Sequence, residues 1–593
     1  MKTEFLAGLK RSHYCGDLRE ANIGETVTVF GWCQRQRDLG QLIFIDLRDR
    51  TGIVQLAFDD STDREVFEKA FQIRSEYVLA AVGLVRERSS KNKDIATGAI
   101  EIEVKELRVL GISETPPFEI LENSNTSEEL RLKYRYLDLR RPDLQRNIIM
   151  RHKISKVTRD YFDENGFIEI ETPMLIRSTP EGARDFLVPS RIHQGTFYAL
   201  PQSPQLYKQL SMVAGFDRYM QIARCFRDED LRADRQPEFT QIDLEMSFVD
   251  VEDVLAIGEG YVKRLFKEVL NVDIPTPLPR ITYKDAMEKY GSDKPDTRYG
   301  MEICDLSDIV KDCGFGVFTN AIAGGGSVRA IVAKDAVKTL TRKEIDKLTE
   351  MMRGIGAKGL AWARLTPEGT TCSFAKFMTE EQMNAIYEKA GCETGDVLLV
   401  IADTKTNHVL TQLGALRQAV AKKLDIIPDQ FNFLWVVEFP FFEFDEDNNT
   451  WVAMHHPFTS PMDECLPYLE SDKGNVRAKA YDLVLNGIEL CSGSIRITNS
   501  ELQDRMFSLL GLSKEEAHQK FGFLLDAFKY GAPPHGGMGL GLDRIAMLMM
   551  KRENLRDVIA FPKVQNASEL MTMAPSVVDD IQLKELGIKV DAE

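Results

Sequence analysis

The chain has 593 residues, of which 43% are hydrophobic and 28% charged, and its formal net charge is −17 at pH 7. This length requires several separate cores, and the acidic balance argues against a protein that coats nucleic acid with a basic surface. No stretch approaches the ~18 apolar residues of a membrane span, and the N-terminus lacks a signal-peptide core. Nine scattered cysteines without a Cys-x-x-Cys pair argue against disulfides or a zinc site. We therefore expect a cytoplasmic protein without a membrane segment.

Residues 1–112 are rich in segments that alternate apolar and polar side chains, as strands do. Five such segments with one helix between the third and the fourth match a small OB barrel, whose sheet face binds oligonucleotides. The predicted strands are 26–33, 42–47, 52–58, 77–85 and 100–104, and the predicted helix is 63–72.

Side chains suited to nucleic acid lie on these predicted strands. Arg35, Arg37, Arg48 and Arg50 are candidates for backbone contacts, and Phe44 for stacking on an unpaired base. The alternative is a core phenylalanine with solubilising arginines, and taken alone this part of the chain favours it.

A polar linker, expected over residues 113–132, precedes two predicted helices at 130–139 and 144–165. The strand predicted over 167–175 carries Pro173 near its end. Because proline donates no hydrogen bond to a neighbouring strand, this segment is expected at a sheet edge or an interface. A polar loop over 178–185 then has the composition of a mobile lid.

The stretch from Arg224 to Glu245 combines two strand-like runs with a highly charged loop. Arg227, Arg232 and Arg235 in that loop are suited to polyphosphate, because a guanidinium pairs bidentately with phosphate oxygens. A solvated hairpin tip is the common alternative for a charged loop. Before it, Ser203, Gln205 and Lys208 gather at a loop-to-helix junction, where each alone would more often serve as a cap or a surface residue.

Residues 281–425 are predicted to form an inserted domain without a catalytic cluster. The insertion follows a predicted helix at 251–270; its own predicted helices are 341–354, 379–390 and 412–424, and its predicted strands are 327–333 and 396–402.

The last third of the chain carries two further candidate features. Asp482 and Glu489 flank an Asn-Gly hairpin turn, and two neighbouring carboxylates suit Mg²⁺, with Arg496 expected on the following strand. A glycine-rich strand over 536–541 runs into an apolar helix, which allows close backbone approach and favours anions, although the spacing fits neither a Rossmann fold nor a P-loop.

Three blocks, in this order along the chain, resemble the three motifs of class II aminoacyl-tRNA synthetases. They are the Pro173 strand, the Phe226-Arg-Asp-Glu hairpin and Gly539-Leu-Gly-Leu-Asp-Arg544. The similarity covers the whole chain, and its length and insertion resemble the bacterial aspartyl branch; the insertion also resembles a domain of tRNA-dependent amidotransferases. The strings similar to the aspartyl branch are Gln202-Ser-Pro-Gln-Leu-Tyr-Lys, Arg235-Gln-Pro-Glu-Phe-Thr-Gln-Ile-Asp and Met454-His-His-Pro-Phe-Thr-Ser-Pro.

The resemblance implies an α+β multidomain homodimer with the Pro173 strand at its interface. The catalytic sheet should have six or seven antiparallel strands flanked by helices, behind an N-terminal OB barrel that reads the anticodon. The implied divisions are 1–112 for the barrel, 113–132 for the linker, 133–280 and 426–562 for the catalytic domain, 281–425 for the insertion and 563–593 for a C-terminal extension.

The implied reaction joins L-aspartate to ATP, giving aspartyl-adenylate and pyrophosphate, and then transfers the aspartyl group to the 3′ end of tRNA(Asp). It needs positioning and charge neutralisation rather than a protein nucleophile. The resemblance implies catalytic roles for Arg227, Arg544 and His455, and it implies that Asp482 and Glu489 bind Mg²⁺. The residues implied to bind ATP are Arg227, Asp228, Glu229, Gln236, Phe239, Glu489, Gly541, Leu542, Asp543 and Arg544.

For L-aspartate, the resemblance implies that Arg496 and Lys208 clamp the side-chain carboxylate. Such a cationic pair rejects a neutral amide, because asparagine would leave both charges uncompensated. The remaining implied aspartate residues are Glu181 in the lid, Ser203, Gln205 and Asp243 for the ammonium group, and Arg227 and His455.

For tRNA, the resemblance implies that Phe44 stacks on an anticodon base while Gln55 and Glu101 bind base edges. Leu39 resembles the residue of strict enzymes; relaxed enzymes, which also charge tRNA(Asn), often have histidine there. A relaxed enzyme stays an alternative. A non-catalytic RNA-binding paralogue is disfavoured by the intact arginines and carboxylates, and an amide-forming ligase by the presence of the barrel.

Overall fold

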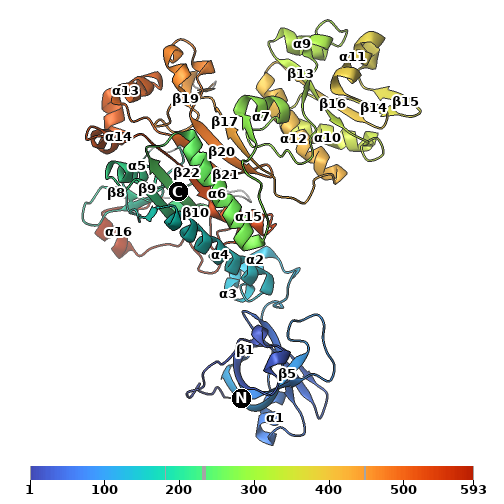
Figure 1. Ribbon diagram of the computed structural model, residues 1–593, viewed down its shortest axis with the longest axis vertical. Helices are drawn as coiled ribbons and strands as arrows, with labels where there is room; N and C mark the ends of the chain where they lie inside the picture. Colours follow the sequence, from blue (N-terminus) through green and yellow to red (C-terminus); the bar gives the residue numbers. More distant parts are fainter. Residues whose placement is uncertain (1, 180–181, 230–234, 446–448, 592–593) are drawn as a thin grey trace. The chain divides into compact units, whose positions relative to one another are not determined.

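The computed structural model describes residues 2–179, 182–229, 235–445 and 449–591 (Figure 1). It divides into two compact units. The first unit comprises Met1–Lys153, Asp230–Pro237 and Ala546–Gln582, and the second comprises Ile154–Glu229, Glu238–Ile545 and Leu583–Glu593. None of the described helices has the length and apolar character needed to cross a membrane.

The N-terminal part of the first unit is a closed five-stranded barrel, which confirms the predicted OB fold. The strands follow the order β1-β2-β3-β5-β4, and helix α1 (Arg64–Phe71) lies between β3 and β4 in the chain. Alternate side chains such as Val27, Val29, Ile43 and Ile45 fill its interior, as the period-two pattern requires. The strands are β1 (Thr26–Asp38), β2 (Ile43–Asp49), β3 (Gly52–Phe58), β4 (Val78–Glu87) and β5 (Ile100–Gly111).

Arg48 corrects one prediction from the sequence. It was a candidate for contacting nucleic acid, but its side chain is buried and its Nη2 lies 2.7 Å from Glu76 Oε2. Arg140 pairs with the same glutamate at 2.9 Å. Arg48 therefore neutralises the buried Glu76 within the barrel, and Glu76 in turn ties the barrel to the later Arg140. Arg50, in contrast, is exposed and contacts Tyr14.

The segment predicted as one helix over 130–139 is two short helices, α2 (Glu128–Lys133) and α3 (Arg135–Asp138), separated at Tyr134. The buried Arg135 side chain donates to the backbone oxygens of Arg556, Ile559 and Ala560. These bonds, together with a 2.6 Å pair with Asp138, tie α3 to the C-terminal part of the same unit. Helix α4 (Pro142–Glu164) follows.

The second unit is built on an eight-stranded sheet with the order β11-β17-β20-β21-β22-β10-β9-β6. Its six central strands pair antiparallel, as the family resemblance implied, but the two edge strands pair parallel to their neighbours. The central strands are β17 (Phe433–Val437), β20 (Ala480–Leu485), β21 (Ile488–Ile495), β22 (His535–Gly541), β10 (Glu238–Ser247) and β9 (Arg218–Phe226), and the edges are β11 (Arg280–Thr282) and β6 (Ile168–Glu169).

The strand predicted over 167–175 is wrong in length. Only Ile168–Glu169 pairs with β9, and Pro173 lies beyond the strand. The predicted position at a sheet edge is confirmed, because β6 is the last strand of the sheet.

Helix α6 (Val251–Leu270) covers one face of this sheet (Figure 1). A Cβ at Gly258 would lie 3.2 Å from the side chains of Trp435 and Met538, so glycine allows the helix to approach β17 and β22 closely. Helix α5 (Gln205–Val213) contacts the opposite face, where Lys208 reaches Asp243 of β10. This second face carries the candidate site.

The insertion contains its own five-stranded sheet of order β12-β13-β16-β14-β15. Apolar cores cover both of its faces: α10 and α12 contribute to one, and α8, α9 and α11 to the other (Figure 1). The predicted strands and helices here are confirmed with shifts of at most one residue, except that the helix predicted over 412–424 begins six residues earlier, at Thr406. The elements are α7 (Tyr283–Tyr290), β12 (Cys304–Asp305), α8 (Ser307–Val310), α9 (Gly316–Ala323), β13 (Ser327–Ala333), α10 (Arg342–Gly354), β14 (Ala361–Thr366), β15 (Gly369–Cys372), α11 (Glu380–Ala390), β16 (Val397–Asp403) and α12 (Thr406–Leu424).

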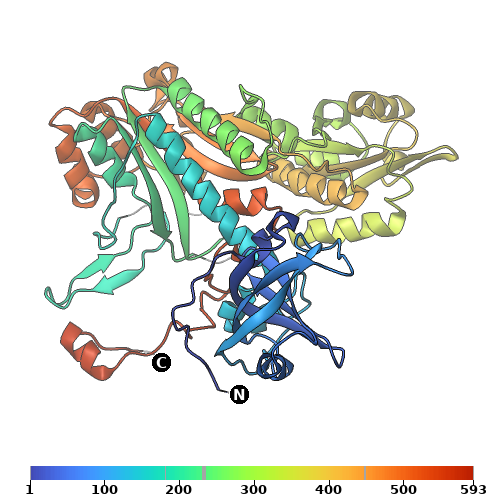
Figure 2. The same cartoon turned by 60° about the horizontal axis from the view of Figure 1, so that its bottom comes forward.

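Two hairpins and four helices complete the elements used below. The β7–β8 hairpin projects from the large sheet in Figure 2. The predicted glycine-rich strand and its helix are confirmed as β22 and α15. The hairpins are β7 (Leu187–Pro189) with β8 (Phe197–Ala199) and β18 (Phe442–Asp445) with β19 (Thr450–Ala453), and the helices are α13 (Ser500–Leu509), α14 (Lys514–Phe528), α15 (Leu542–Met549) and α16 (Asp580–Leu586).

Replacing Arg48 with Met should lower the free energy of unfolding of the barrel by about 3 kcal/mol, because Glu76 would keep a buried charge with less compensation. Calorimetric or urea unfolding of the full chain measures the change. Arg50→Met is the matched control and should leave stability within about 0.5 kcal/mol. Equal effects of the two changes would contradict the structural role of Arg48.

Candidate functional site

The centre of the site is formed where β10 lies beside the glycine-rich strand β22. Their register places Asp243 opposite Gly539 and Glu245 opposite Gly537. A Cβ at Gly537 would lie 2.1 Å from the backbone oxygen of Leu244 and 2.3 Å from Glu245 Oε2, so only glycine fits there. A Cβ at Gly539 would come within 3.2 Å of Asp243 Oδ1, which is a tight contact, so the glycines of β22 leave space for the two carboxylates of β10.

Four buried charged side chains meet on this face. Lys208 Nζ lies 3.1 Å from Asp243 Oδ1 and 3.6 Å from Glu245 Oε2. Arg496 binds Glu245 with two bonds, Nε to Oε1 at 2.9 Å and Nη2 to Oε2 at 3.2 Å. The predicted pair of Arg496 and Lys208 is thus brought together, around a glutamate to which the sequence had assigned no role.

The two carboxylates differ in proton affinity. Burial raises the pKa of Asp243, although the positive charge of Lys208 opposes the change. Burial alone would also raise the pKa of Glu245, but Arg496 and Lys208 overcome it and hold that pKa below its ordinary value. Glu245 is therefore a permanent counter-charge for the two cations, whereas Asp243 keeps one oxygen without a partner among the described residues.

The adjacent histidines make different contacts. His456 Nε2 lies 2.7 Å from Arg496 Nη1, so it supports the arginine. His455 packs its ring edge-on against Phe439, with the ring centres 5.0 Å apart. Burial, helped by the charge of Arg496, lowers the pKa of His455 to about 4, so this imidazole is neutral at physiological pH.

Arg227 stands at the end of the β9 strand, and its guanidinium lies over the ring of Phe239 with the carbon 5.1 Å from the ring centre. The two residues come from the paired strands of the predicted hairpin. The neighbouring Asp228 bridges to the backbone of Arg184 and lies 3.7 Å from its guanidinium. The stacked pair offers a cation and an aromatic face to one ligand.

Asp482 and Glu489 lie on the paired strands β20 and β21, joined by a turn in which Asn486 and Gly487 both have positive φ. This confirms the Asn-Gly hairpin predicted from the sequence. Burial and the charge of Glu489 raise the pKa of Asp482 well above its ordinary value, against a hydrogen bond from Ser492. The two carboxylates thus lie close enough to repel each other.

A divalent cation fits this pair. Asp482 Oδ1 is buried and makes no hydrogen bond to the described residues, as expected of an atom that awaits a ligand. Nowhere in the described parts of the chain do three or more His, Cys, Asp or Glu side chains gather as a metal site. Two carboxylates without a third match Mg²⁺, which takes its remaining ligands from water and phosphate.

Of the residues predicted at the end of β22 and the start of α15, Arg544 contacts this carboxylate pair. Arg544 Nη1 donates to the backbone oxygen of Glu489 at 3.0 Å and lies 4.0 Å from its Oε1. The side chain of Arg544 lies over Gly541. Asp543 Oδ2 accepts a 2.8 Å bond from the backbone of Thr240, which joins α15 to β10. Leu542 is buried and serves packing.

Several of the predicted site residues have a buried polar atom without a hydrogen bond to any described residue. In folded proteins such atoms are few, and each requires a ligand, a water or another explanation. Five of the predicted residues have a buried atom without a hydrogen bond to the described parts of the chain: Gln205 Nε2, Arg227 Nε, Asp243 Oδ2, His455 Nε2 and Asp482 Oδ1.

The other predicted residues stand as follows. Ser203 Oγ accepts from the backbone of Gln205 at the start of α5, the capping role weighed as its alternative. Gln236 is in the first unit and bonds the backbone of Lys563 through both its amide atoms. Glu229 and Arg235 take part in other interactions. Glu181 and Arg232 lie outside the described residues.

The predicted anticodon residues form one network on the outer face of the barrel. Gln55 is buried; its Nε2 donates to Glu101 Oε2 at 2.7 Å, and its Oε1 accepts from Arg37 at 2.9 Å and from Arg88 at 2.8 Å. The guanidinium of Arg37 also lies over Phe44, 5.7 Å from the ring centre. Polar side chains that are already oriented beside a half-buried aromatic ring suit base recognition.

Leu39 lies in the loop between β1 and β2, and 67% of its surface is exposed. The loop is closed by a hydrogen bond from its backbone to Leu42, and Gly40 has a positive φ. A large apolar side chain held at the tip of a hairpin is available for contact with a partner.

Sequence reasoning missed several residues of the site. Glu245 ends the charged stretch from Arg224 and His456 lies within one of the quoted strings, but neither was assigned to Arg496. Arg496 directly follows β21, the strand that carries Glu489, so it does not lie on a further strand as predicted. Lys294, which lies 3.7 Å from Glu489 Oε2, comes from the insertion. A possible signal was the density of charges in Ser292-Asp-Lys-Pro-Asp296.

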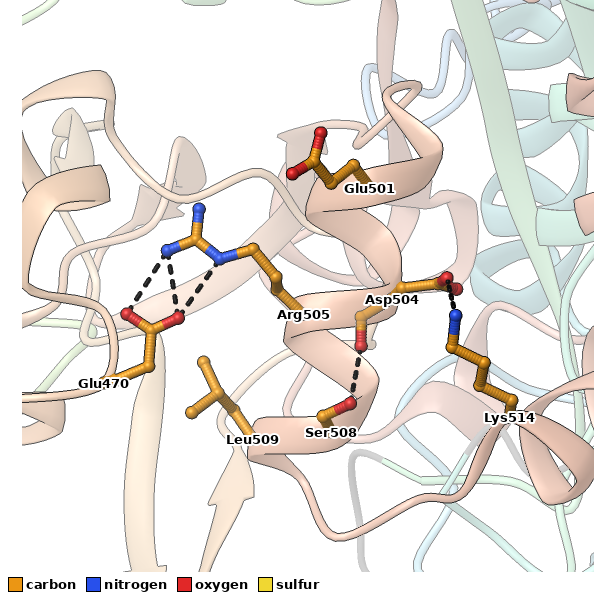
Figure 3. Close-up of a pocket in the computed structure, with 7 residues that line it drawn as sticks. All are labelled: Glu470, Glu501, Asp504, Arg505, Ser508, Leu509 and Lys514. Atoms are coloured by element: carbon orange, nitrogen blue, oxygen red, sulfur yellow. Dashed lines mark hydrogen bonds and ion pairs between the residues drawn. The ribbon is translucent and has the colours of Figure 1, made fainter.

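A pocket of about 320 Å³ lies away from this cluster, at α13 and the start of α14 (Figure 3). Four of its charged side chains form two ion pairs, Arg505 with Glu470 at 2.9 Å and Lys514 with Asp504 at 2.9 Å. None of the predicted residues lines it. The candidate site is therefore the buried charge cluster and not this surface pocket.

Comparisons with known proteins agree with this geometry. Residues 127–565 match the family of tRNA synthetases class II (D, K and N), and residues 27–110 match an OB-fold nucleic acid binding domain. The chain is 63% identical to the aspartate–tRNA ligase of Ruminiclostridium cellulolyticum, and the match covers all of both chains. It is 58% identical to the aspartate–tRNA(Asp/Asn) ligase of Caldanaerobacter subterraneus subsp. tengcongensis, over 99% of this chain and 100% of that one.

The asparaginyl-tRNA synthetase from Pyrococcus horikoshii, solved with asparaginyl-adenylate, has the same fold, with a TM-score of 0.59 at 19% identity. That match covers 93% of this chain and 98% of the solved one. The family resemblance found in the sequence motifs is confirmed. The chain therefore belongs to the class II tRNA synthetases (D, K and N) and carries an OB-fold nucleic acid binding domain near its N-terminus.

Proposed function

We propose that this protein is an aspartate–tRNA ligase, which activates L-aspartate with ATP and transfers it to the 3′ end of tRNA(Asp). The observation that carries the proposal is the buried cluster of Lys208, Asp243, Glu245 and Arg496 with unsatisfied atoms around it. The names of full-length relatives with 56–63% identity support it. A non-catalytic RNA-binding protein would not need ligand-ready atoms on buried cations and carboxylates.

The cluster discriminates aspartate from asparagine through charge. Arg496 and Lys208 present the positive charge that receives the substrate's side-chain carboxylate, and Asp243 Oδ2 is available for its ammonium group. Gln205, whose amide nitrogen lacks a partner among the described residues, lies beside Arg496. The aspartate carboxylate would add charge-assisted hydrogen bonds from both cations, and the neutral amide of asparagine would form weaker ones and would bring NH2 donors against cationic donors.

The nucleotide is held on the neighbouring strands. Phe239 stacks on the adenine, Arg227 binds the α-phosphate and the aspartate α-carboxylate, and Arg544 binds the γ-phosphate; Asp228, Glu229, Gln236, Gly541, Leu542 and Asp543 complete the proposed ATP set. In the first step the α-carboxylate attacks the α-phosphorus and pyrophosphate leaves. The arginines hold the reacting groups in line and neutralise their charge, so no protein nucleophile is needed.

Asp482 and Glu489 would hold Mg²⁺, because Asp482 Oδ1 is buried and unpartnered beside a second carboxylate. When bound, the ion supplies positive charge that offsets the charge of the phosphate oxygens. His455, neutral and next to the cluster, provides a hydrogen-bonding group near the carboxylate and phosphate. Glu181 is proposed to close the site as part of the lid.

The barrel reads the anticodon through Phe44, Gln55 and Glu101, which one hydrogen-bonded network already orients. We assign residues 1–112 to this function, 113–132 to the linker, 133–280 and 426–562 to catalysis, 281–425 to the insertion and 563–593 to the C-terminal extension. Nine free cysteines accord with a reducing cytoplasm.

The active form is a homodimer. We base the homodimer on exposed large apolar side chains on the edge strand β6, shortly after it, and on the β7–β8 hairpin. Large apolar side chains exposed on an edge strand and on a hairpin are typical of a surface that binds a partner. The exposed residues are Ile168, Leu175, Leu187, Ile192 and Phe197.

Replacing Arg496 with Lys tests the aspartate clamp. Lysine keeps the charge that Glu245 needs but loses the bidentate fork, so the KM for aspartate should rise roughly 100-fold while the KM for ATP stays within about twofold. Aspartate-dependent pyrophosphate exchange with ATP measures both. Unchanged aspartate kinetics would refute the clamp, and no exchange by the unmodified protein would revive the non-catalytic alternative.

Replacing Gln55 with Ala tests the barrel. The kcat/KM for tRNA charging should fall at least tenfold, because a base contact is lost and Glu101 and Arg37 lose their partner, while pyrophosphate exchange is unaffected. Arg64→Ala, on the exposed side of α1, is the matched control and should leave both reactions unchanged. An equal loss of charging and exchange in the Gln55 variant would contradict anticodon reading.

Charging of a purified tRNA(Asn) transcript tests strictness. With Leu39 at the tip of the β1–β2 hairpin, we expect the protein to charge tRNA(Asp) at least 100-fold more efficiently than tRNA(Asn), and Leu39→His to narrow this ratio. Comparable efficiency on both transcripts would assign the relaxed function that the name of the Caldanaerobacter relative describes.

A further inference from the structure

One short segment of the insertion lies next to the candidate metal site. Residues 292–298 follow α7, and Lys294 Nζ lies 3.7 Å from Glu489 Oε2 and 3.0 Å from Asp293 Oδ2. The charge of Lys294 also acts on the buried Asp482. A cation from the insertion therefore faces the carboxylate pair, while Arg544 faces Glu489 at 4.0 Å.

The buried Arg417 of α12 holds this segment in place through hydrogen bonds to its backbone. Its guanidinium donates to the backbone oxygens of Asp296 at 2.7 Å and Met301 at 3.0 Å, and it lies over the ring of Tyr299 at 4.3 Å. Arg298 closes the turn with two bonds to Asp296, at 2.9 and 2.7 Å. The position of Lys294 is thus set by the packed interior of the insertion and not by a free loop.

The segment is also anchored to the large sheet. Asn432 Nδ2 donates to Thr297 Oγ1 at 3.1 Å, and Asn432 and Asn486 exchange further bonds at the turn between β20 and β21. A Cβ at Gly487 would come within 3.0 Å of Asp296. The hairpin that carries Asp482 and Glu489 and the segment that carries Lys294 therefore keep a fixed spacing.

Two carboxylates that repel each other are stabilised by a nearby cation. A divalent cation would supply that charge more strongly than one ammonium group and would prefer the same oxygens. Because the Lys294 side chain is 42% exposed, it has room to turn aside without disturbing the core.

We propose that Lys294 is the resident counter-cation of the Asp482–Glu489 site, which neutralises the pair before nucleotide binds and is displaced when a divalent cation arrives. The insertion thereby sets the affinity of the site for metal. This role rests on the metal function proposed above for the two carboxylates.

Titration of the nucleotide-free full chain with Mn²⁺, followed by the EPR signal of the free ion, tests the role. Removing a competing cation should strengthen binding, so Lys294→Met should lower the Kd for Mn²⁺ about fivefold. Lys294→Arg restores the charge and should return the Kd to within about twofold of the unmodified protein. Asp482→Asn should abolish Mn²⁺ binding at this site, which identifies the binding that depends on the carboxylate pair.

Lys311→Met is the matched control, because Lys311 is an exposed lysine of the same insertion. It should leave the Kd unchanged in 0.3 M KCl, where charges far from the site are screened. A Kd for Lys294→Met that is unchanged or higher, with Asp482-dependent binding intact, overturns the role of Lys294 alone. Absence of Asp482-dependent binding in the unmodified protein overturns the metal function and the Lys294 role together.

Discussion

The buried pairing of Arg496 with Glu245 is the interaction on which the site depends. Burying either charge alone would cost several kcal/mol, so each requires the other, and Lys208 with Asp243 extends the pairing to four groups. The space for these groups comes from the glycines of β22, which leave the adjacent surface of the sheet free of side chains. The glycine content of β22 is therefore linked to the charged side chains of the neighbouring strand β10.

The pairing also holds the buried cations in place and charged before a substrate binds. Glu245 keeps its charge because its pKa is held low, whereas burial raises the pKa of Asp243 and leaves that carboxyl group with an unpartnered oxygen. A site whose charges are balanced but which keeps unsatisfied polar atoms is preorganised, because its side chains need little rearrangement when a charged ligand binds.

Buried or partly buried charged side chains also link the more distant parts of each unit. In the second unit, the insertion fixes its segment through Arg417 and presents Lys294 to the carboxylate hairpin. In the first unit, the buried Arg135 joins α3 to the C-terminal part, and Arg140 joins the segment after α3 to the buried Glu76 of the barrel, which Arg48 also neutralises. Arginine serves in all of these places because its planar group satisfies several backbone or carboxylate oxygens at once.

Hydrophobic alternation was enough to predict the OB barrel and the β9–β10 hairpin, and turn residues and glycine content were enough to predict the Asn-Gly turn and the glycine-rich strand, because these features depend on neighbours in the chain. The motif strings were enough to predict the family. The pattern failed where a segment depends on remote contacts: the strand over 167–175 shortened to two residues, and Arg48 turned inward to Glu76.

The sequence by itself determined which residue types were available for the chemistry and their order along the chain. Only the tertiary structure decided that Glu245 neutralises Arg496, that His456 supports it and that Lys294 of the insertion faces Glu489. The physical reason is that a charge pair requires proximity in space, and these partners are separated by tens to hundreds of residues. Strand register and burial bring them together, and neither is encoded in the local spacing of any one motif.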